Sequence, residues 1–383
     1  MRVGIIGLGA RIASLMPHFQ AAAPDLTVTG VADPSDDRMG ALGALGHTPT
    51  RYDTAEQMLD QTFDMLMIGS PNHLHLDHLR QALQSDTPHI FAEKPLVITE
   101  DETLELARLA ARHDGVRRVM VGLVLRYAPL YRALRQAQAD GALGEIMSIE
   151  ASEHIGPYHG SFFMRDWRRD SRLSGGFMLE KCCHDLDLYQ GVVGARAMQI
   201  ASFGGRKKYL PDHRPEAAPG YLAAMTPRWN GVADAFGGDG DIVDYQVGLV
   251  RYANGAALSF HTNLNVPDEF RRFAVIGRDG MAEGDFIRNT FRVTSSDSGA
   301  KLVDAEAFAD GQMVGHYGAD AAMASDVMDY VRGARDSLPL TMTDALEAGV
   351  TAMAMDRARA QGQIIDLAPF WSDFDAALSA EAA

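Results

Sequence analysis

The sequence has few cysteines and no long apolar run. Only two of its 383 residues are cysteines, Cys182 and Cys183, and adjacent cysteines seldom bridge each other. A disulfide scaffold is therefore excluded, and a reducing compartment is favoured. The chain begins without the pattern of a signal peptide, so we expect a cytoplasmic protein. No apolar run approaches the roughly 18 residues that a membrane-spanning helix needs, so we expect no membrane segment.

Positive charge is also scarce. The chain carries 35 Lys plus Arg against 51 Asp plus Glu, a formal net charge of −16 at pH 7. Such a chain repels a polyanion, so neither DNA nor RNA is an expected partner. The rest of the composition, with 46% hydrophobic and 22% charged residues, is typical of a folded globular protein. The length fits two domains.

The first 123 residues show a βαβ rhythm. Short apolar runs at residues 3–7, 26–32, 65–68, 89–92 and 118–122 alternate with longer amphipathic stretches. Parallel strands need crossover connections, and these are usually helical. The pattern predicts an α/β domain over residues 1–123 with a doubly wound parallel sheet.

From about residue 145 the apolar period changes to two. The runs are residues 145–153, 198–203, 241–252, 256–263, 269–276 and 290–295, with helical patterns at 320–334 and 343–361. Asn254-Gly255 and Asp279-Gly280 are expected to supply the positive φ of tight hairpins. Residues 124–383 are therefore predicted to form a second α/β domain with a large, mostly antiparallel open sheet. Residues 204–240, rich in Gly and Pro, are expected to be a lid, an interface element or a mobile loop.

A GxGxxA turn at residues 7–13 is the first chemical signal. It follows the first apolar run and opens a helix; Gly7 permits the tight turn and Gly9 lets a pyrophosphate approach the backbone. Asp33 follows the second run and would accept hydrogen bonds from a ribose while repelling a 2′-phosphate, which favours NAD over NADP. Arg38 lies nearby and keeps NADP possible. The alternative is that the small residues only solve a packing problem.

Two further motifs follow the third and fourth apolar runs, Ser70-Pro71-Asn72 with His75, and Glu93-Lys94-Pro95. In open α/β sheets, ligands bind outside the carboxyl ends of the strands. Lys94, held there beside a dinucleotide, could hydrogen-bond a substrate hydroxyl. The alternative is a solvated surface lysine beside a turn proline.

Glu180, His184 and Asp187 stand at i, i+4 and i+7, so a helix would place them on one face. A histidine that titrates near neutrality can take a hydroxyl proton, and a neighbouring carboxylate can orient it or accept the proton onward. One alternative is an exposed face with paired charges. Another is a metal cluster with Cys182 and Cys183, but vicinal cysteines point to different faces and no second CxxC-type half exists, so no metal is expected. The cysteines are expected to be small buried residues.

Together these motifs resemble the Gfo/Idh/MocA family of NAD(P)-dependent oxidoreductases, which includes inositol dehydrogenases and sugar oxidoreductases. The resemblance also covers Arg126-Tyr127-Ala128-Pro129, Leu143-Gly144-Glu145-Ile146, Trp167-Arg168 and Gly175-Gly176. It implies a Rossmann domain, followed by an α/β domain whose open sheet carries the substrate site on one face and often a subunit interface on the other. The run Lys181-Cys182-Cys183 departs from the small residues common in the family and marks a subfamily.

The resemblance also implies roles for individual residues. Lys94 is the catalytic lysine, His184 the acid/base, and Glu180, where the family commonly has Asp, a proton shuttle. The implied cofactor site comprises Gly7, Gly9, Ala10, Arg11, Ile12, Asp33, Ser70, Pro71, Asn72, His75, Glu93, Lys94, Arg126, Trp167 and Arg168. For Trp167 and Arg168 the alternative is a core aromatic residue beside a salt-bridged arginine. The expected substrate contacts are Lys94, His154, Tyr158, Glu180, His184 and Asn263.

The implied function is hydride transfer between NAD(P) and a secondary alcohol of a sugar, an inositol or a related polyol. Two alternatives share the fold: an NAD-dependent glycoside hydrolase and a non-catalytic cofactor-sensing regulator. Retention of Lys94 and His184 argues against the regulator, since a sensor needs no proton relay. The expected partners are a small carbohydrate or polyol and further copies of the chain, as a homodimer or homotetramer formed through the C-terminal sheet.

Overall fold

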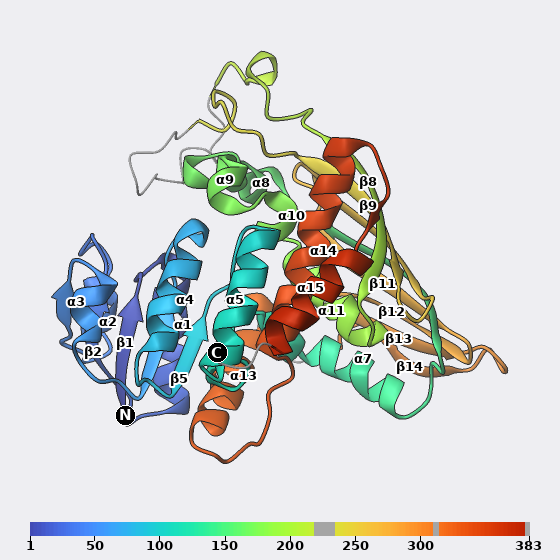
Figure 1. Ribbon diagram of the computed structural model, residues 1–383. Coiled ribbons are helices and arrows are strands. Elements are labelled where there is room, and N and C mark those ends of the chain that lie inside the picture. Colours follow the sequence, from blue (N-terminus) through green and yellow to red (C-terminus); the bar gives the residue numbers. More distant parts are fainter. Residues whose placement is uncertain (218–233, 309–313, 380–383) are drawn as a thin grey trace. The chain divides into compact units, whose positions relative to one another are not determined.

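A computed structural model describes residues 1–217, 234–308 and 314–379 (Figure 1). The chain divides into two compact units. The first comprises Met1–Ala128, Met313–Leu346 and Phe370–Ala383, and the second Pro129–Gln312 and Glu347–Pro369. The predicted domain boundary between residues 123 and 124 stays a prediction. Of the predicted loop at 204–240, residues 218–233 lie outside the described part.

The first unit contains a six-stranded parallel sheet in the order β3-β2-β1-β4-β5-β6, which confirms the predicted doubly wound fold. Its strands are β1 (Arg2–Ile6), β2 (Thr27–Ala32), β3 (Thr50–Tyr52), β4 (Met65–Ile68), β5 (His89–Ala92) and β6 (Val119–Val121). The short β3 was missed because its Thr-Arg-Tyr sequence has no apolar pattern. The chain leaves β1 towards β3 and returns on the other side at β4. In doubly wound sheets, ligands bind outside the carboxyl ends of the strands at such a reversal, here next to β1 and β4.

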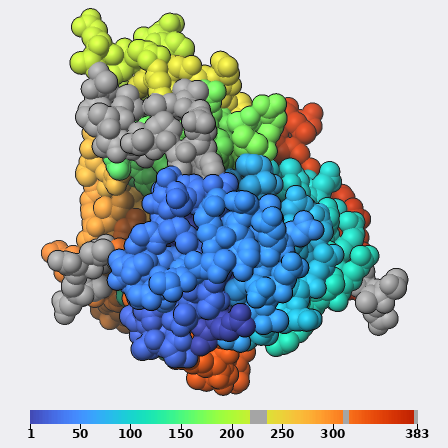
Figure 2. Space-filling view, turned by 90° about the vertical axis from the view of Figure 1, so that its left-hand side faces the viewer, coloured from blue at the N-terminus to red at the C-terminus, as the bar shows by residue number. Residues whose placement is uncertain are grey.

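Helices connect or follow these strands. They are α1 (Ala10–Ala22), α2 (Met39–Gly43), α3 (Ala55–Leu59), η1 (Asn72–Leu74), α4 (His75–Gln84), α5 (Glu100–Arg112), α6 (Gly115–Arg118), η2 (Val124–Tyr127) and, from later in the chain, α13 (Val314–Val331). The side of the unit with α2 and α3 faces the viewer in Figure 2. In the described part of the chain, no helix combines the length and apolar character that crossing a bilayer requires.

The second unit contains a nine-stranded sheet in the order β14-β13-β12-β11-β7-β10-β9-β8-β15. Its strands are β7 (Ile146–His154), β8 (Ala197–Gly205), β9 (Tyr245–Tyr252), β10 (Ala257–Asn263), β11 (Phe270–Gly277), β12 (Gly280–Asp285), β13 (Thr290–Ser295), β14 (Lys301–Ala305) and β15 (Ile365–Asp366). Among the described strands of this second sheet, only the β7–β10 pair is parallel, so the expected mostly antiparallel sheet is confirmed.

Helices form much of the rest of the second unit, and most of them are short. They are α7 (Pro129–Ala139), α8 (Pro157–Phe163), η3 (Asp166–Arg169), α9 (Ser171–Ser174), α10 (Phe177–Glu180), α11 (Cys183–Val193) and η4 (Pro211–His213); α14 (Met342–Gln361) and α15 (Ala368–Ser379) contribute residues to both units. Figure 1 shows α11 against one face of the sheet.

The two predicted hairpin turns differ in their chemistry. Gly255, between β9 and β10, has φ +89° as expected. Neither Asp279, between β11 and β12, nor Gly280, the first residue of β12, has a positive φ, so that part of the prediction is wrong. Close packing requires a glycine at position 280, because a Cβ there would lie 2.2 Å from the Ala142 carbonyl oxygen.

Candidate functional site

The turn between β1 and α1 lies so close to the turn after β4 that their backbones are nearly in contact. Gly7 has φ +81°, and a Cβ on it would lie 2.5 Å from the Ser70 nitrogen. A Cβ on Gly9 would lie 2.9 Å from the Gly69 carbonyl oxygen. No side chain fits between the two turns, so these glycines are required by geometry.

The first turn of α1 presents backbone N–H groups that its own residues do not cap. Gly9 is the N-cap residue and makes no side-chain cap, and the first turn contains no acidic residue. Such a helix start attracts an anion, because the N–H groups and the helix dipole both favour negative charge. The backbone cradle and the uncapped helix start together fit the pyrophosphate of a dinucleotide.

Asp33 fastens this turn to the end of β2. Its side chain is 2% exposed and accepts hydrogen bonds from the Leu8 N–H at 2.8 Å and the Ser35 N–H at 2.9 Å. Arg51 holds the next bend by donating to the carbonyl oxygens of Asp33 and Pro34, both at 3.0 Å. Asp33 therefore has a structural role in the turn, and its contact with a ribose stays a prediction.

Arg11, in the first turn of α1, is engaged by two carboxylates. Its guanidinium donates to both oxygens of Asp320 on α13, at 2.6 and 3.0 Å, and its Nε lies 3.3 Å from Glu93 Oε1. Burial by itself would raise the pKa of Asp320, but His316 and Arg11 hold it well below its usual range. Asp320 was missed from the sequence because it stands 309 residues from Arg11 with no local motif.

The predicted motifs after β4 and β5 are joined by His75. This side chain is 1% exposed, with Nδ1 2.6 Å from the Pro95 carbonyl oxygen and Nε2 2.8 Å from the Ser70 carbonyl oxygen. Lys94, directly before Pro95 in the chain, has a half-buried side chain, and its peptide bond to Pro95 is cis. The first unit thus gathers both motifs at the carboxyl ends of its central strands.

Two more predicted residues of the first unit have defined partners. Glu93 is buried, and burial raises the pKa of its carboxyl although Arg11 and Lys94 oppose the shift. Arg126, in η2, donates to the Pro339 carbonyl oxygen at 3.0 Å and lies 3.7 Å from Asp344. Arg126 therefore ties η2 to the later segment of the same unit.

The second unit carries Glu180 and His184, but not on one continuous helix. Helix α10 ends at Glu180 and α11 begins at Cys183, so the expected single helix over these residues is wrong. Glu180 and His184 are each 5% exposed and Asp187 is 1% exposed, which excludes the alternative of a solvated charged face.

Glu180 is held by Arg168. The Arg168 Nε lies 3.2 Å from Glu180 Oε1, and the guanidinium stacks over the rings of Phe162 and Trp167 at 4.1 and 4.2 Å from the centroids. The Trp167-Arg168 pair is thus an aromatic residue beside a salt-bridged arginine, although Trp167 is only half-buried. Its contact with the cofactor stays a prediction.

Neither Cys182 nor Cys183 forms a disulfide, and both are buried. Burial raises the pKa of the Cys182 thiol well above its usual value. Within the described ranges no group of three or more His, Cys, Asp or Glu side chains is arranged to hold a metal ion.

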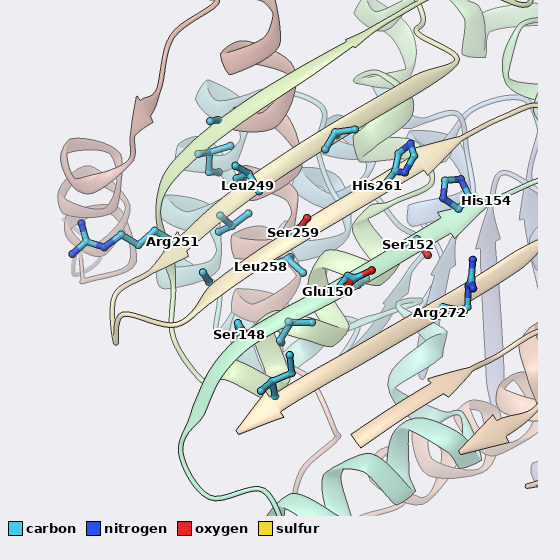
Figure 3. A pocket seen from close by; sticks show the side chains of 18 of the residues that line it. Ser148, Glu150, Ser152, His154, Leu249, Arg251, Leu258, Ser259, His261 and Arg272 are labelled. Atoms are coloured by element: carbon cyan, nitrogen blue, oxygen red, sulfur yellow. The ribbon is translucent and has the colours of Figure 1, made fainter. Parts of the chain in front are cut away.

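His154 and Asn263 lie on the open face of the second sheet, away from α11. They are register partners on β7 and β10 and line the same pocket. Figure 3 shows His154 in this pocket. The His154 ring packs 4.5 Å from that of His261, and burial together with His261 lowers the pKa of His154 to about 4. Neighbouring Glu153 points to the opposite, helix-covered face, where it pairs with Lys181.

His154 and Asn263 thus lie on the sheet face opposite the one that α11 covers, and their contact with a substrate stays a prediction. Successive side chains on a strand point to opposite faces, and proximity in sequence does not reveal which face a residue takes. Tyr158, also expected at the substrate, is 55% exposed on α8.

Comparisons with known proteins cover most of the chain. Residues 1–123 match the GFO_IDH_MocA family model, described as "Oxidoreductase family, NAD-binding Rossmann fold". Residues 131–283 match the model described as "GFO/IDH/MocA C-terminal domain".

Individual relatives are distant. An uncharacterized oxidoreductase of Bacillus subtilis, YrbE, is 24% identical over 95% of this chain and 96% of its own. A myo-inositol 2-dehydrogenase of Thermotoga maritima is 23% identical over 78% of this chain and 79% of its own. A levoglucosan dehydrogenase structure with NADH and levoglucosan has a TM-score of 0.77 at 18% identity, covering 96% of this chain and 99% of that one, which shows a shared fold.

We predict that Gly9→Ala weakens NADH binding by at least about tenfold, because the new methyl group would meet the Gly69 carbonyl oxygen and push the turns apart. Calorimetric titration measures this change. Gly40→Ala is the matched control, since its Cβ would have no neighbour within 4 Å. Equal NADH affinity in Gly9→Ala and Gly40→Ala would contradict the assignment of the cradle.

We predict that His78 makes the fold sensitive to acid. Burial, reinforced by His75, lowers its pKa from 6.5 to about 4, and its Nδ1 lies 2.8 Å from Ser70 Oγ. Because the folded-state pKa lies below the unfolded value, this stability is present above pH 6.5 and is lost as pH falls towards 4. The loss at pH 5 is about 1–2 kcal/mol.

Melting temperatures between pH 7 and pH 5 test this expectation. The unmodified chain should lose more melting temperature over this range than His78→Gln, which carries no titrating group at that position. Parallel curves for the two proteins would show that His78 does not take up a proton on unfolding.

Proposed function

The chain belongs to the GFO/IDH/MocA oxidoreductase family, and from this premise we propose that it oxidises a secondary alcohol of a sugar, an inositol or a related polyol. The observation that carries the proposal is the backbone cradle of the β1–α1 turn, in the same unit as Lys94. Relatives named as inositol and sugar dehydrogenases support the substrate class.

The residues present fit a nicotinamide dinucleotide. Gly7, Gly9 and the start of α1 would hold its pyrophosphate, and Asp33 would face its adenosine ribose. We propose NAD as the preferred form, because a buried carboxylate disfavours a 2′-phosphate; NADP is the second candidate. When bound, the nicotinamide ring supplies the hydride acceptor.

The residues of the chain manage the proton and the position of the substrate. We propose that His184 takes the hydroxyl proton and that Lys94 donates a hydrogen bond to the same oxygen. Glu180, four residues before His184, would accept the proton onward or orient the imidazole, and its contact with Arg168 fixes its carboxylate. Tyr158 stays in the proposed substrate set. His154 and Asn263, which line the pocket on the open face of the second sheet, also stay in that set.

We further propose that the chain forms a homodimer or homotetramer through the open face of the second sheet. Phe203 on β8 and Leu249 on β9 are 74% and 54% exposed, and Ile364 beside the same pocket is 70% exposed. Large apolar side chains grouped on one face mark a contact surface. Two cysteines that form no disulfide fit the proposed cytoplasmic location.

Lys94→Ala and His184→Ala should each lower kcat by roughly 100- to 10,000-fold, because each removes a group that handles the substrate proton or oxygen. The Kd for NADH should stay within about threefold, since neither group is proposed to hold the pyrophosphate. NADH absorbance with a panel of cyclitols and sugars gives the rates. Lys301→Ala, which removes a half-exposed lysine from β14, is the control.

An unchanged rate in either variant would remove that residue from the mechanism. Cleavage of a glycoside by the unmodified protein without net NADH formation would replace the dehydrogenase by a hydrolase. Binding of NADH without turnover of any compound in the panel would favour a sensing role.

A further inference from the structure

A buried cluster of four charged side chains lies beneath the break between α10 and α11. Arg271, on β11, is 1% exposed, and its Nε and Nη2 donate to the two carboxylate oxygens of Asp185 at 2.8 and 2.6 Å. Asp185 is fully buried in the first turn of α11. This two-pronged contact fixes both the distance and the orientation of α11 relative to the sheet.

The cluster continues across the sheet to the break itself. Glu153 on β7 is the cross-strand register partner of Arg271, and its Oε2 lies 2.8 Å from the Arg271 Nε. Its Oε1 lies 3.0 Å from the Lys181 Nζ, and Lys181 stands in the two-residue break between the helices. The charges therefore alternate in the order Asp185, Arg271, Glu153, Lys181.

This arrangement is balanced, with two carboxylates and two cations. Burial alone would raise the pKa of Glu153, but Arg271 and Lys181 hold it below its usual value. Arg271, Asp185 and Glu153 have almost no contact with water, and the Lys181 side chain is 13% exposed. Removing one member leaves a net charge in a region that solvent screens poorly.

The cluster holds the backbone on both sides of His184. Lys181 precedes His184 by three residues and Asp185 follows it directly. Both anchors reach adjacent strands of one sheet, so the segment that carries the imidazole is fixed at two points.

We propose that the Asp185–Arg271–Glu153–Lys181 cluster positions His184 and sets the charge around its imidazole, so that Arg271 and Lys181 are positioning residues of the reaction. The inference rests on the proposed function, in which His184 takes the substrate proton. It also gives the Lys181-Cys182-Cys183-His184-Asp185 run a physical purpose, since its two charged ends hold the segment while the two cysteines fill buried space between them.

Near-isosteric variants change the charge of the cluster while they largely keep its shape. Lys181→Met leaves the cluster with an extra negative charge, which stabilises the imidazolium and should raise the pKa of His184 by about one unit. Glu153→Gln leaves an extra positive charge and should lower that pKa by a similar amount. The double variant restores neutrality and should return it towards the original value. A purely structural role would not produce opposite shifts that cancel.

NMR titration of labelled histidine side chains in the full-length protein measures this pKa directly. The His184 signal is assigned by its absence in His184→Gln. The other titratable groups that interact with members of the cluster stay unchanged in these variants: Tyr189 on α11, His159 on α8 and Cys182 in the break. Identical His184 titrations in Lys181→Met, Glu153→Gln and the unmodified protein would overturn the proposal.

Kinetics give a second readout. Arg271→Lys keeps the charge but loses the two-pronged contact, so kcat should fall roughly 10- to 100-fold while the His184 titration and the Kd for NADH stay unchanged. Arg292→Met is the control, because it removes an arginine that pairs with Glu283 and Asp304 on the outer strands. Full activity in Arg271→Lys would overturn the positioning role.

The two hypotheses fail in different ways. If the unmodified protein turns over no polyol, the proposed function fails, and the His184 titration still decides whether the cluster sets the imidazole charge. If the unmodified protein is active but the titrations coincide, only the cluster proposal fails.

Discussion

Two turns of the first unit meet with no room for a side chain between them, and the candidate cofactor site depends on this close approach. Gly7 and Gly9 bring the start of α1 against the backbone that follows β4. The contact leaves the helix N-terminus as the group available to an anion at the carboxyl ends of the central strands. Asp33 adds to the same constraint by binding the Leu8 N–H within the turn.

Both units use a buried or half-buried arginine to hold a functional helix. Arg11 in the first unit and Arg271 in the second each make a two-pronged contact with an aspartate, 309 and 86 residues away in the chain. In each case one member of the pair lies in the first turn of the helix, Arg11 in α1 and Asp185 in α11. Paired charges are costly to bury but specify one geometry, which suits a segment that has to present a reactive group.

Sequence patterns predicted what depends on local periodicity and on spacing. The apolar runs located all but one strand of the first sheet, and the GxGxxA spacing predicted the glycine turn. The patterns did not reveal Asp320 or Arg271, whose partners lie far away in the chain. They also gave no sign of the break after Glu180, because neither Gly nor Pro marks it. The face taken by His154 was hidden as well, because strand alternation fixes only relative orientation.

Calorimetric titration of the unmodified protein with NADH and then with NADPH tests the central claim most directly, because the rest of the account depends on a dinucleotide at the glycine turn. We predict saturable binding of one NADH per chain and weaker binding of NADPH, which the Asp33 carboxylate disfavours. The absence of heat with both coenzymes would contradict the account.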